Sequence, residues 1–260
     1  MVIEDTRSRK AEGLKPLVYE PYEYQTPCKC LESKLRRERR ERSGIPPKYE
    51  LANLKEFRTD IYKRPDSRER AAVVKEFATK VVRRFEDLMN SGVDSIGLYL
   101  YSDEKGSGKT FTACALANHL IAAAGLETRF HVVEELLEDI RSTYNNNNER
   151  TRAQIMDELK RVDLLVLDEI GIGSESRFVT RTLYELIDYR KNHRKMTVFT
   201  SNLRVDQLES AYIGDDGRIG RRIQEMTNQL DFPEENVTPA ENRKDTSEVF
   251  KILGMGDKSE

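Results

Sequence analysis

Residues 96–110 constrain the fold of this chain more than any other segment. They begin with an apolar run ending at Tyr101, which predicts a buried strand, and continue into a loop that contains Gly106 and Gly108. Lys109 and Thr110 then open an apolar helix. A strand, a glycine-containing loop and a helix in this order form a phosphate cradle, because backbone N–H groups and the helix N-terminus face the anion. An ordinary turn between strand and helix is the alternative on this segment alone.

The motif predicts a role for each residue of the loop. Lys109 is expected to reach the β- and γ-phosphates of ATP, and the Thr110 hydroxyl to ligate Mg²⁺. Asp103 stands where the motif has its first glycine, and its carboxylate is expected to reduce affinity for phosphates without abolishing ATP binding. The predicted nucleotide-binding residues are Lys105, Gly106, Ser107, Gly108, Lys109, Thr110 and Phe111.

Composition limits the classes of protein that fit. The 260 residues suffice for one large α/β domain and a small appendage. Lys and Arg, 44 in all, nearly balance 46 Asp and Glu, so any nucleic-acid contact must be local. Without a long apolar segment or an apolar signal core, the sequence predicts no membrane contact and a cytoplasmic location. Cys28 and Cys30 cannot supply the four ligands of a structural zinc site, so no zinc is expected.

The rest of the chain alternates between strand and helix patterns, which predicts a parallel sheet covered by helices on both faces. The expected strands after the loop are residues 128–133, 162–167 and 196–200, and the expected helices are 67–89 and 178–189.

The predicted domains are an N-terminal segment, 1–45, a core, 46–235, and a polar tail, 236–260. The N-terminal segment contains an Arg-rich helix over 31–42, which Gly44 and Pro46 end. This basic helix either docks on an acidic partner surface or contacts DNA, and a solvated helix stabilised by its own ion pairs is the alternative.

Two acidic residues follow the strand pattern at 162–167. Asp168 at the end of a central strand is expected to hold Mg²⁺ beside the phosphate loop, and Glu169 to orient or deprotonate the attacking water. The strand at 196–200 leads into Ser201 and Asn202, and the Asn202 amide is expected to position that water. A strand that ends in two acids, and a simple Ser-Asn turn, are the alternatives.

Arg218 and Arg222 lie near the start of a further helix pattern. An arginine suits the stabilisation of charge on a transferring phosphoryl group, and such an arginine finger contributes roughly 10³–10⁵ in rate. Supplied from a neighbouring subunit, it would require self-association. A solvated Arg-rich helix is the alternative.

Taken together, these motifs resemble the DnaC/DnaI-type helicase loaders, which are AAA+ ATPases of the initiator clade. The resemblance extends over roughly residues 28–230 and implies a P-loop αβα sandwich with a five-stranded parallel sheet and ATP bound between subunits. It assigns the finger to Arg222, with Arg218 close by, and the sensor to Asn202. It also implies a helix over 134–160 that projects into a central pore, and single-stranded DNA contacts at Tyr144, Ser176 and Phe178. Core packing is the alternative for the two rings.

The resemblance implies an ATP-dependent loader that places a DnaB-type replicative hexameric helicase on single-stranded DNA, binding it through residues before about 45. One alternative is an IstB-type transposition helper ATPase that binds duplex DNA and a transposase. The other is a non-hydrolysing antagonist of helicase or loader, for which Asp103 is the supporting feature.

Overall fold

The computed structural model of this chain describes residues 29–143, 150–171 and 176–238. The chain divides into two compact units, residues 1–34 and 35–260, and the sheet and its helices belong to the second. Within the described ranges no helix is both long enough and apolar enough to cross a bilayer.

A five-stranded sheet forms the centre of this unit, in the order β2-β3-β4-β1-β5, and all neighbouring strands run parallel. The prediction of a five-stranded parallel α/β sheet is therefore confirmed. The strands are β1 (Gly97–Tyr101), β2 (Thr128–Val132), β3 (Leu164–Asp168), β4 (Met196–Ser201) and β5 (Thr227–Asp231).

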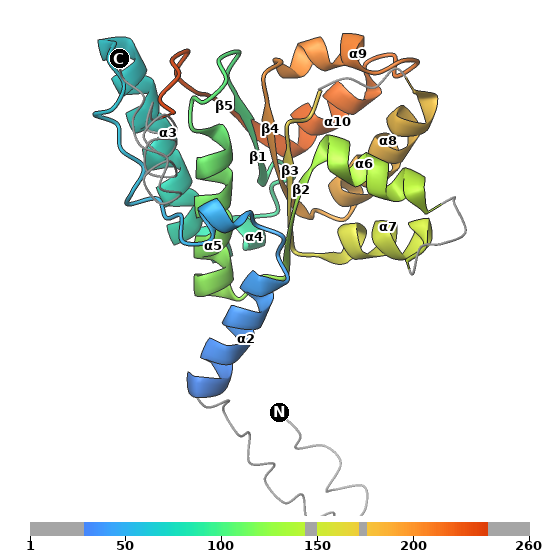
Figure 1. The fold of residues 1–260 in the computed structure, drawn as a ribbon, viewed down its shortest axis with the longest axis horizontal. Coiled ribbons are helices and arrows are strands. Elements are labelled where there is room, and N and C mark those ends of the chain that lie inside the picture. Colours follow the sequence, from blue (N-terminus) through green and yellow to red (C-terminus); the bar gives the residue numbers. More distant parts are fainter. Residues whose placement is uncertain (1–28, 144–149, 172–175, 239–260) are drawn as a thin grey trace, which may run out of the picture. The chain divides into compact units, whose positions relative to one another are not determined.

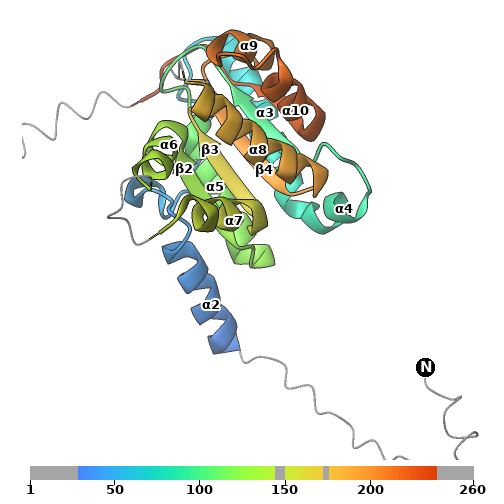
Figure 2. The same ribbon diagram turned by 90° about the vertical axis from the view of Figure 1, so that its right-hand side faces the viewer.

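Helices cover both faces of the sheet. Helices α3 and α5 lie on one face, and α6, α7, α8 and α10 lie on the other (Figure 1); Figure 2 looks onto the second of these layers. The helices are α2 (Lys29–Glu41), α3 (Pro65–Arg83), α4 (Phe85–Asn90), α5 (Lys109–Ala124), α6 (Val133–Ser142), α7 (Arg152–Arg161), α8 (Arg177–Asn192), α9 (Leu208–Ala211) and α10 (Arg218–Met226). Short 3₁₀ turns occupy η1 (Pro47–Tyr49) and η2 (Val205–Gln207).

Alternate strand residues belong to two separate apolar clusters. In β1, Leu98 and Leu100 pack with α3 and α5, whereas Tyr99 packs with the helices of the opposite layer. Successive side chains of a strand point to opposite faces, so a sheet covered on both sides needs near-continuous apolar strands. This requirement explains why the central strands were recognisable as unbroken apolar runs.

A buried arginine joins the second helical layer to the sheet. The Arg190 side chain on α8 is 1% exposed and donates hydrogen bonds to the Thr197 hydroxyl (2.9 Å) and to the Met196 carbonyl (2.6 Å) of β4. It also donates to the carbonyls of Leu159 (2.7 Å) and Val162 (3.0 Å) at the end of α7. Burial lowers the pKa of Arg190 to about 9. One side chain thereby fixes the relative positions of α7, α8 and β4.

The last turn of α2 and the residues that follow it contact the edge of the sheet. Arg39 donates to Glu127 (3.1 Å), and the Phe130 N–H donates to the Ser43 carbonyl (2.7 Å), beside β2. Gly44 has a φ of 75°, and a methyl group there would lie 2.9 Å from the Phe130 carbonyl oxygen, so only glycine fits. The predicted end of the helix before Pro46 agrees with this turn, while the boundary at residue 45 remains a prediction.

Candidate nucleotide-binding site

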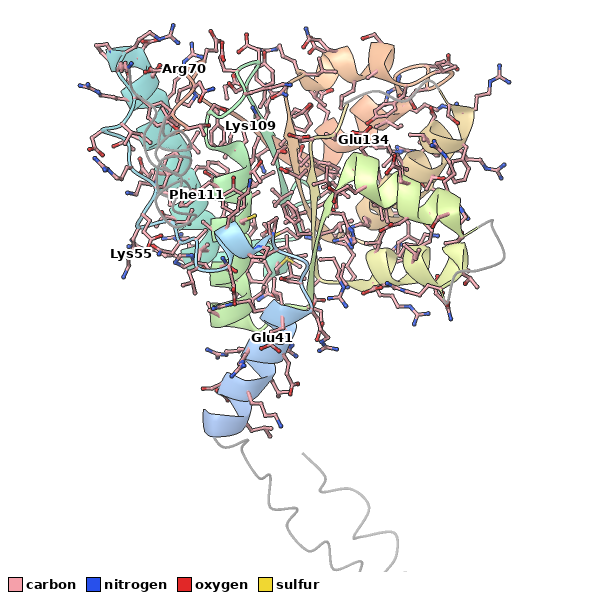
Figure 3. The ribbon with its side chains drawn as sticks, viewed as in Figure 1. Glu41, Lys55, Arg70, Lys109, Phe111 and Glu134 are labelled. Atoms are coloured by element: carbon pink, nitrogen blue, oxygen red, sulfur yellow. The ribbon has the colours of Figure 1, made fainter. Side chains whose placement is uncertain are left out.

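The phosphate loop connects β1 to α5 as the sequence predicted. Gly106 and Gly108 have φ values of 73° and 96°, a conformation that glycine adopts without strain. Lys109 lies at the upper end of α5 in Figure 3, with Phe111 on the same turn. The positive φ at Gly108 reverses the chain so that helix α5 begins at Lys109, with its N-terminus at the loop.

The Lys109 ammonium group is buried within the loop itself. Its Nζ donates to the carbonyls of Ser102 (2.9 Å) and Glu104 (2.9 Å) and to the Ser107 hydroxyl (3.3 Å). Burial lowers the pKa of Lys109 to about 8, against the attraction of nearby carboxylates, with that of Asp168 the largest. The positive charge on this amine therefore depends on pH in the mildly alkaline range.

Asp168 at the end of β3 joins three elements of the site. Thr110 on α5 donates to Asp168 Oδ1 (2.9 Å), and Thr200 on β4 donates to the same oxygen (2.6 Å). The Thr200 hydroxyl also accepts a hydrogen bond from the Glu169 N–H (2.9 Å). Burial raises the pKa of Asp168, and the two hydroxyl donors oppose that rise. The sequence predicted residue 200 only as the end of a strand, so the hydrogen bonds of Thr200 to the Asp168 carboxylate and the Glu169 N–H were missed.

Oxygen ligands suitable for magnesium are therefore adjacent here. The Thr110 hydroxyl and the Asp168 carboxylate, the predicted pair, lie within hydrogen-bonding distance of each other and at the edge of the phosphate loop. Mg²⁺ prefers hard oxygen ligands and keeps several waters, so one hydroxyl and one carboxylate suffice on the protein side. The residues present fit the metal.

A cavity of 630 Å³ connects the loop to the acids. Glu169 and Asn202 both line it; Glu169 is exposed and has a φ of 62°, and Asn202 is half-buried. The predicted water-handling residues are thus brought to the same cavity as Lys109. All seven predicted nucleotide-binding residues, from Lys105 to Phe111, line it as well.

Aromatic residues that precede α3 form another wall of this cavity. The rings of Phe57 and Phe111 are stacked with centroids 6.3 Å apart, and Tyr49 meets Phe111 edge-on at 6.3 Å. The buried Tyr62 hydroxyl donates to the Ser107 carbonyl (2.8 Å) and so supports the loop from behind. Sequence reasoning missed this wall, because its residues lie some fifty positions before the loop and carry no local motif.

The two arginines of α10 lie away from this cavity, since neither is among the described residues that line it. Arg222 Nε is 2.8 Å from Asp188 Oδ1 on α8, and its side chain is 29% exposed. Arg218 donates to the carbonyls of Asp215 (3.0 Å) and Gly214 (3.2 Å). The structure thus gives neither arginine a contact with the cavity of its own chain, and the role of Arg222 as a finger stays a prediction.

The structure describes only two of the three predicted DNA contacts, Ser176 and Phe178. Tyr144 lies outside the described ranges. Ser176 precedes the first turn of α8, and Phe178 is half-buried and packs against the apolar cluster of the second helical layer. Core packing, the alternative for Phe178, therefore explains the buried part of its ring. Its role in DNA binding stays a prediction.

These features define a class of protein. A parallel sheet with strand order β2-β3-β4-β1-β5, a phosphate loop after β1 and an acidic pair after β3 form a P-loop nucleotide-binding core of the AAA+ type. Residues 99–223 match the family model described as "IstB-like ATP binding protein". This segment, just under half of the chain, is therefore similar to IstB/DnaC-type domains.

Known proteins agree with this assignment. The chain is 32% identical over 124 residues to the replicative helicase loader DnaC of Buchnera aphidicola subsp. Baizongia pistaciae (strain Bp), which covers 48% of this chain and 50% of that protein. Among solved structures, DnaI has a TM-score of 0.56 at 24% identity, covering 74% of this chain and 96% of DnaI. The DnaC helicase loader has a TM-score of 0.56 at 22% identity, and the match covers 72% of this chain and 100% of the DnaC chain. The chain spans about half the length of the curated relatives it first matches.

Proposed function

We propose that this chain is an ATPase that loads a replicative helicase onto DNA. The observation that supports ATP hydrolysis most directly is Asp168, which is bonded to both Thr110 and Thr200 at the cavity that Lys109 and Glu169 line. The support for helicase loading comes from the relatives, several of which are named replicative helicase loader DnaC.

In the proposed reaction, the chain's own residues bind the phosphates and orient the attacking water. Lys109 and the loop N–H groups hold the β- and γ-phosphates, and the aromatic wall holds the base. Thr110 and Asp168 would hold Mg²⁺, which would supply positive charge against the phosphates. Glu169 takes the proton of the attacking water, and the Asn202 amide fixes its direction.

Arg222 supplies the remaining charge from a neighbouring copy of the chain. Its ion pair with Asp188 holds the guanidinium on the α8 side of α10, away from its own cavity. This geometry supports self-association through the core. An arginine finger increases the hydrolysis rate by roughly 10³–10⁵, and it must contact the γ-phosphate to do so. Single-stranded DNA would be held by the assembly, with Tyr144, Ser176 and Phe178 as its proposed contacts.

Two variants test the ATPase assignment. Lys109→Ala should abolish nucleotide binding, measured with a fluorescent ATP analogue, because it removes the ammonium that meets the phosphates. Arg222→Ala should leave binding unchanged and stop turnover, with Arg221→Ala, an exposed neighbour, as the control. Equal turnover in the Arg222 variant and the parent would reject Arg222 as the finger.

Co-purification with a DnaB-type helicase, with and without ATP, tests the partner. A stoichiometric complex supports the loader. The family match to IstB-like proteins supports a second candidate, a transposition helper that binds duplex DNA and a transposase. Strong preference for duplex over single-stranded DNA, without helicase binding, would favour that second function.

A further inference from the structure

The chain turns back across the phosphate loop after the last strand. Beyond β5, the Phe232 N–H donates to the Tyr101 carbonyl (2.6 Å), and the Ser102 hydroxyl donates to the Pro233 carbonyl (3.0 Å). The Val237 N–H then donates to the Gly106 carbonyl (3.0 Å) within the loop. We call residues 233–238 the strap.

The carboxylate of Glu235 fixes the strap to the residues that open α3. It accepts hydrogen bonds from the backbone N–H groups of Lys63 (2.6 Å) and Arg64 (3.2 Å), and its side chain is 14% exposed. The bond from Lys63 is the main reason that the pKa of Glu235 lies below its usual value. Arg64 Nη2 in turn donates to the Glu234 carbonyl (2.8 Å). The strap is therefore attached both to the start of α3 and to the loop.

The contact between the strap and the loop is close. A methyl group on Gly106 would overlap the Thr238 hydroxyl and would lie 2.5 Å from Asn236 Oδ1. Val237 packs against the apolar cluster that includes Phe57, and Val237 and Thr238 both line the 630 Å³ cavity. A side chain at Gly106 would have to displace those of Asn236 and Thr238, so the strap packs directly on the loop.

We propose that the strap is part of the nucleotide-binding site. The proposal rests on the proposed function, in that the cavity must bind a nucleotide. The bond from Val237 engages the carbonyl of Gly106, so it restrains the glycine-rich loop without occupying the N–H groups that meet phosphate. Val237 and Thr238 contribute a wall to the cavity. Restraint of a mobile loop in its binding conformation increases affinity, because less conformational entropy is lost when the ligand binds.

Two neighbouring glutamates, Glu234 and Glu235, provide a matched experiment in the 260-residue chain. Glu235→Ala removes the acceptor for two backbone N–H groups and should raise the dissociation constant for ADP about tenfold. Glu234→Ala removes only an ion pair with Arg70 at 3.4 Å, in which both side chains are about half exposed. This variant should change the dissociation constant for ADP less than about twofold. Thermal melts without nucleotide distinguish loss of the strap contact from loss of the whole fold. Glu235→Gln keeps one acceptor oxygen and should give an intermediate dissociation constant for ADP.

The chain contains no tryptophan, so Glu234→Trp introduces a single fluorescent reporter on the strap, at a half-exposed side chain outside the cavity lining. Its emission should change on addition of ADP, and the change should disappear when Lys109→Ala is added. If the parent binds ADP, but Glu235→Ala and Glu234→Ala bind it equally well and the reporter is silent, the strap has no part in the site. If the parent itself fails to bind ADP or ATP, the proposed function and the strap proposal fall together.

Discussion

Nucleotide affinity should decrease with rising pH because of the environment of Lys109. Burial lowers the pKa of this amine from 10.5 to about 8. The charged fraction therefore falls from about 0.8 at pH ~7.5 to about 0.1 at pH ~9. A phosphate ligand binds the charged form, so the dissociation constant should rise about eightfold over this interval. An ordinary, exposed lysine would stay charged and give a flat profile.

The dissociation constant for ADP can be followed by fluorescence or calorimetry across this interval. The phosphates of the ligand do not titrate there, since a second phosphate pKa lies near 6. Lys109→Arg is the control, because guanidinium remains protonated throughout and its profile should be flat even if its absolute affinity is lower. A parent profile that changes less than about twofold, or an equal slope in the arginine variant, would refute the assignment of the titrating group.

Two further variants test the frame of the site. Arg190→Ala should lower the free energy of unfolding by about 4 kcal/mol or more, measured by urea titration, because several buried carbonyls lose their donor; a loss under about 1 kcal/mol would contradict the joining role of Arg190. Thr200→Val should reduce kcat at least about tenfold with little change in nucleotide affinity, since it frees the Asp168 carboxylate and the Glu169 N–H from their shared partner. A change confined to KM would contradict that reading.

The parts of the fold that could be predicted from sequence were those with local signals. The loop from Ser102 to Thr110 carries its conformation in its own glycines, and the central strands are apolar on both sides because helices cover both faces. Strand β5 was not predicted from its residues, because Asn228, Gln229 and Asp231 are exposed and only two of its five positions are buried. A polar edge strand resembles a loop until its partner is known.

The site was predictable only where one motif contains its residues. Asp168 and Glu169 were identified because a strand places them beside the loop. Tyr62 and Glu235 were not identified, and residues 236–260 were predicted only as a polar tail. Their contacts join segments more than forty and more than one hundred and seventy positions apart. Such contacts follow from tertiary packing, and a single sequence contains no local pattern for them.

The strand order also determines when the site can form as the chain is synthesised. In the described sheet β1 pairs with β4 and β5, so that Leu98 pairs with Val198 and Asn228. The strand that carries the phosphate loop thus leaves the ribosome long before either of its partners, with both edges exposed. Non-local pairing of this kind is slow and exposes aggregation-prone edges. The residues that line the candidate site come from segments between Pro46 and Thr238, so the site is complete only when the chain has been made through the strap.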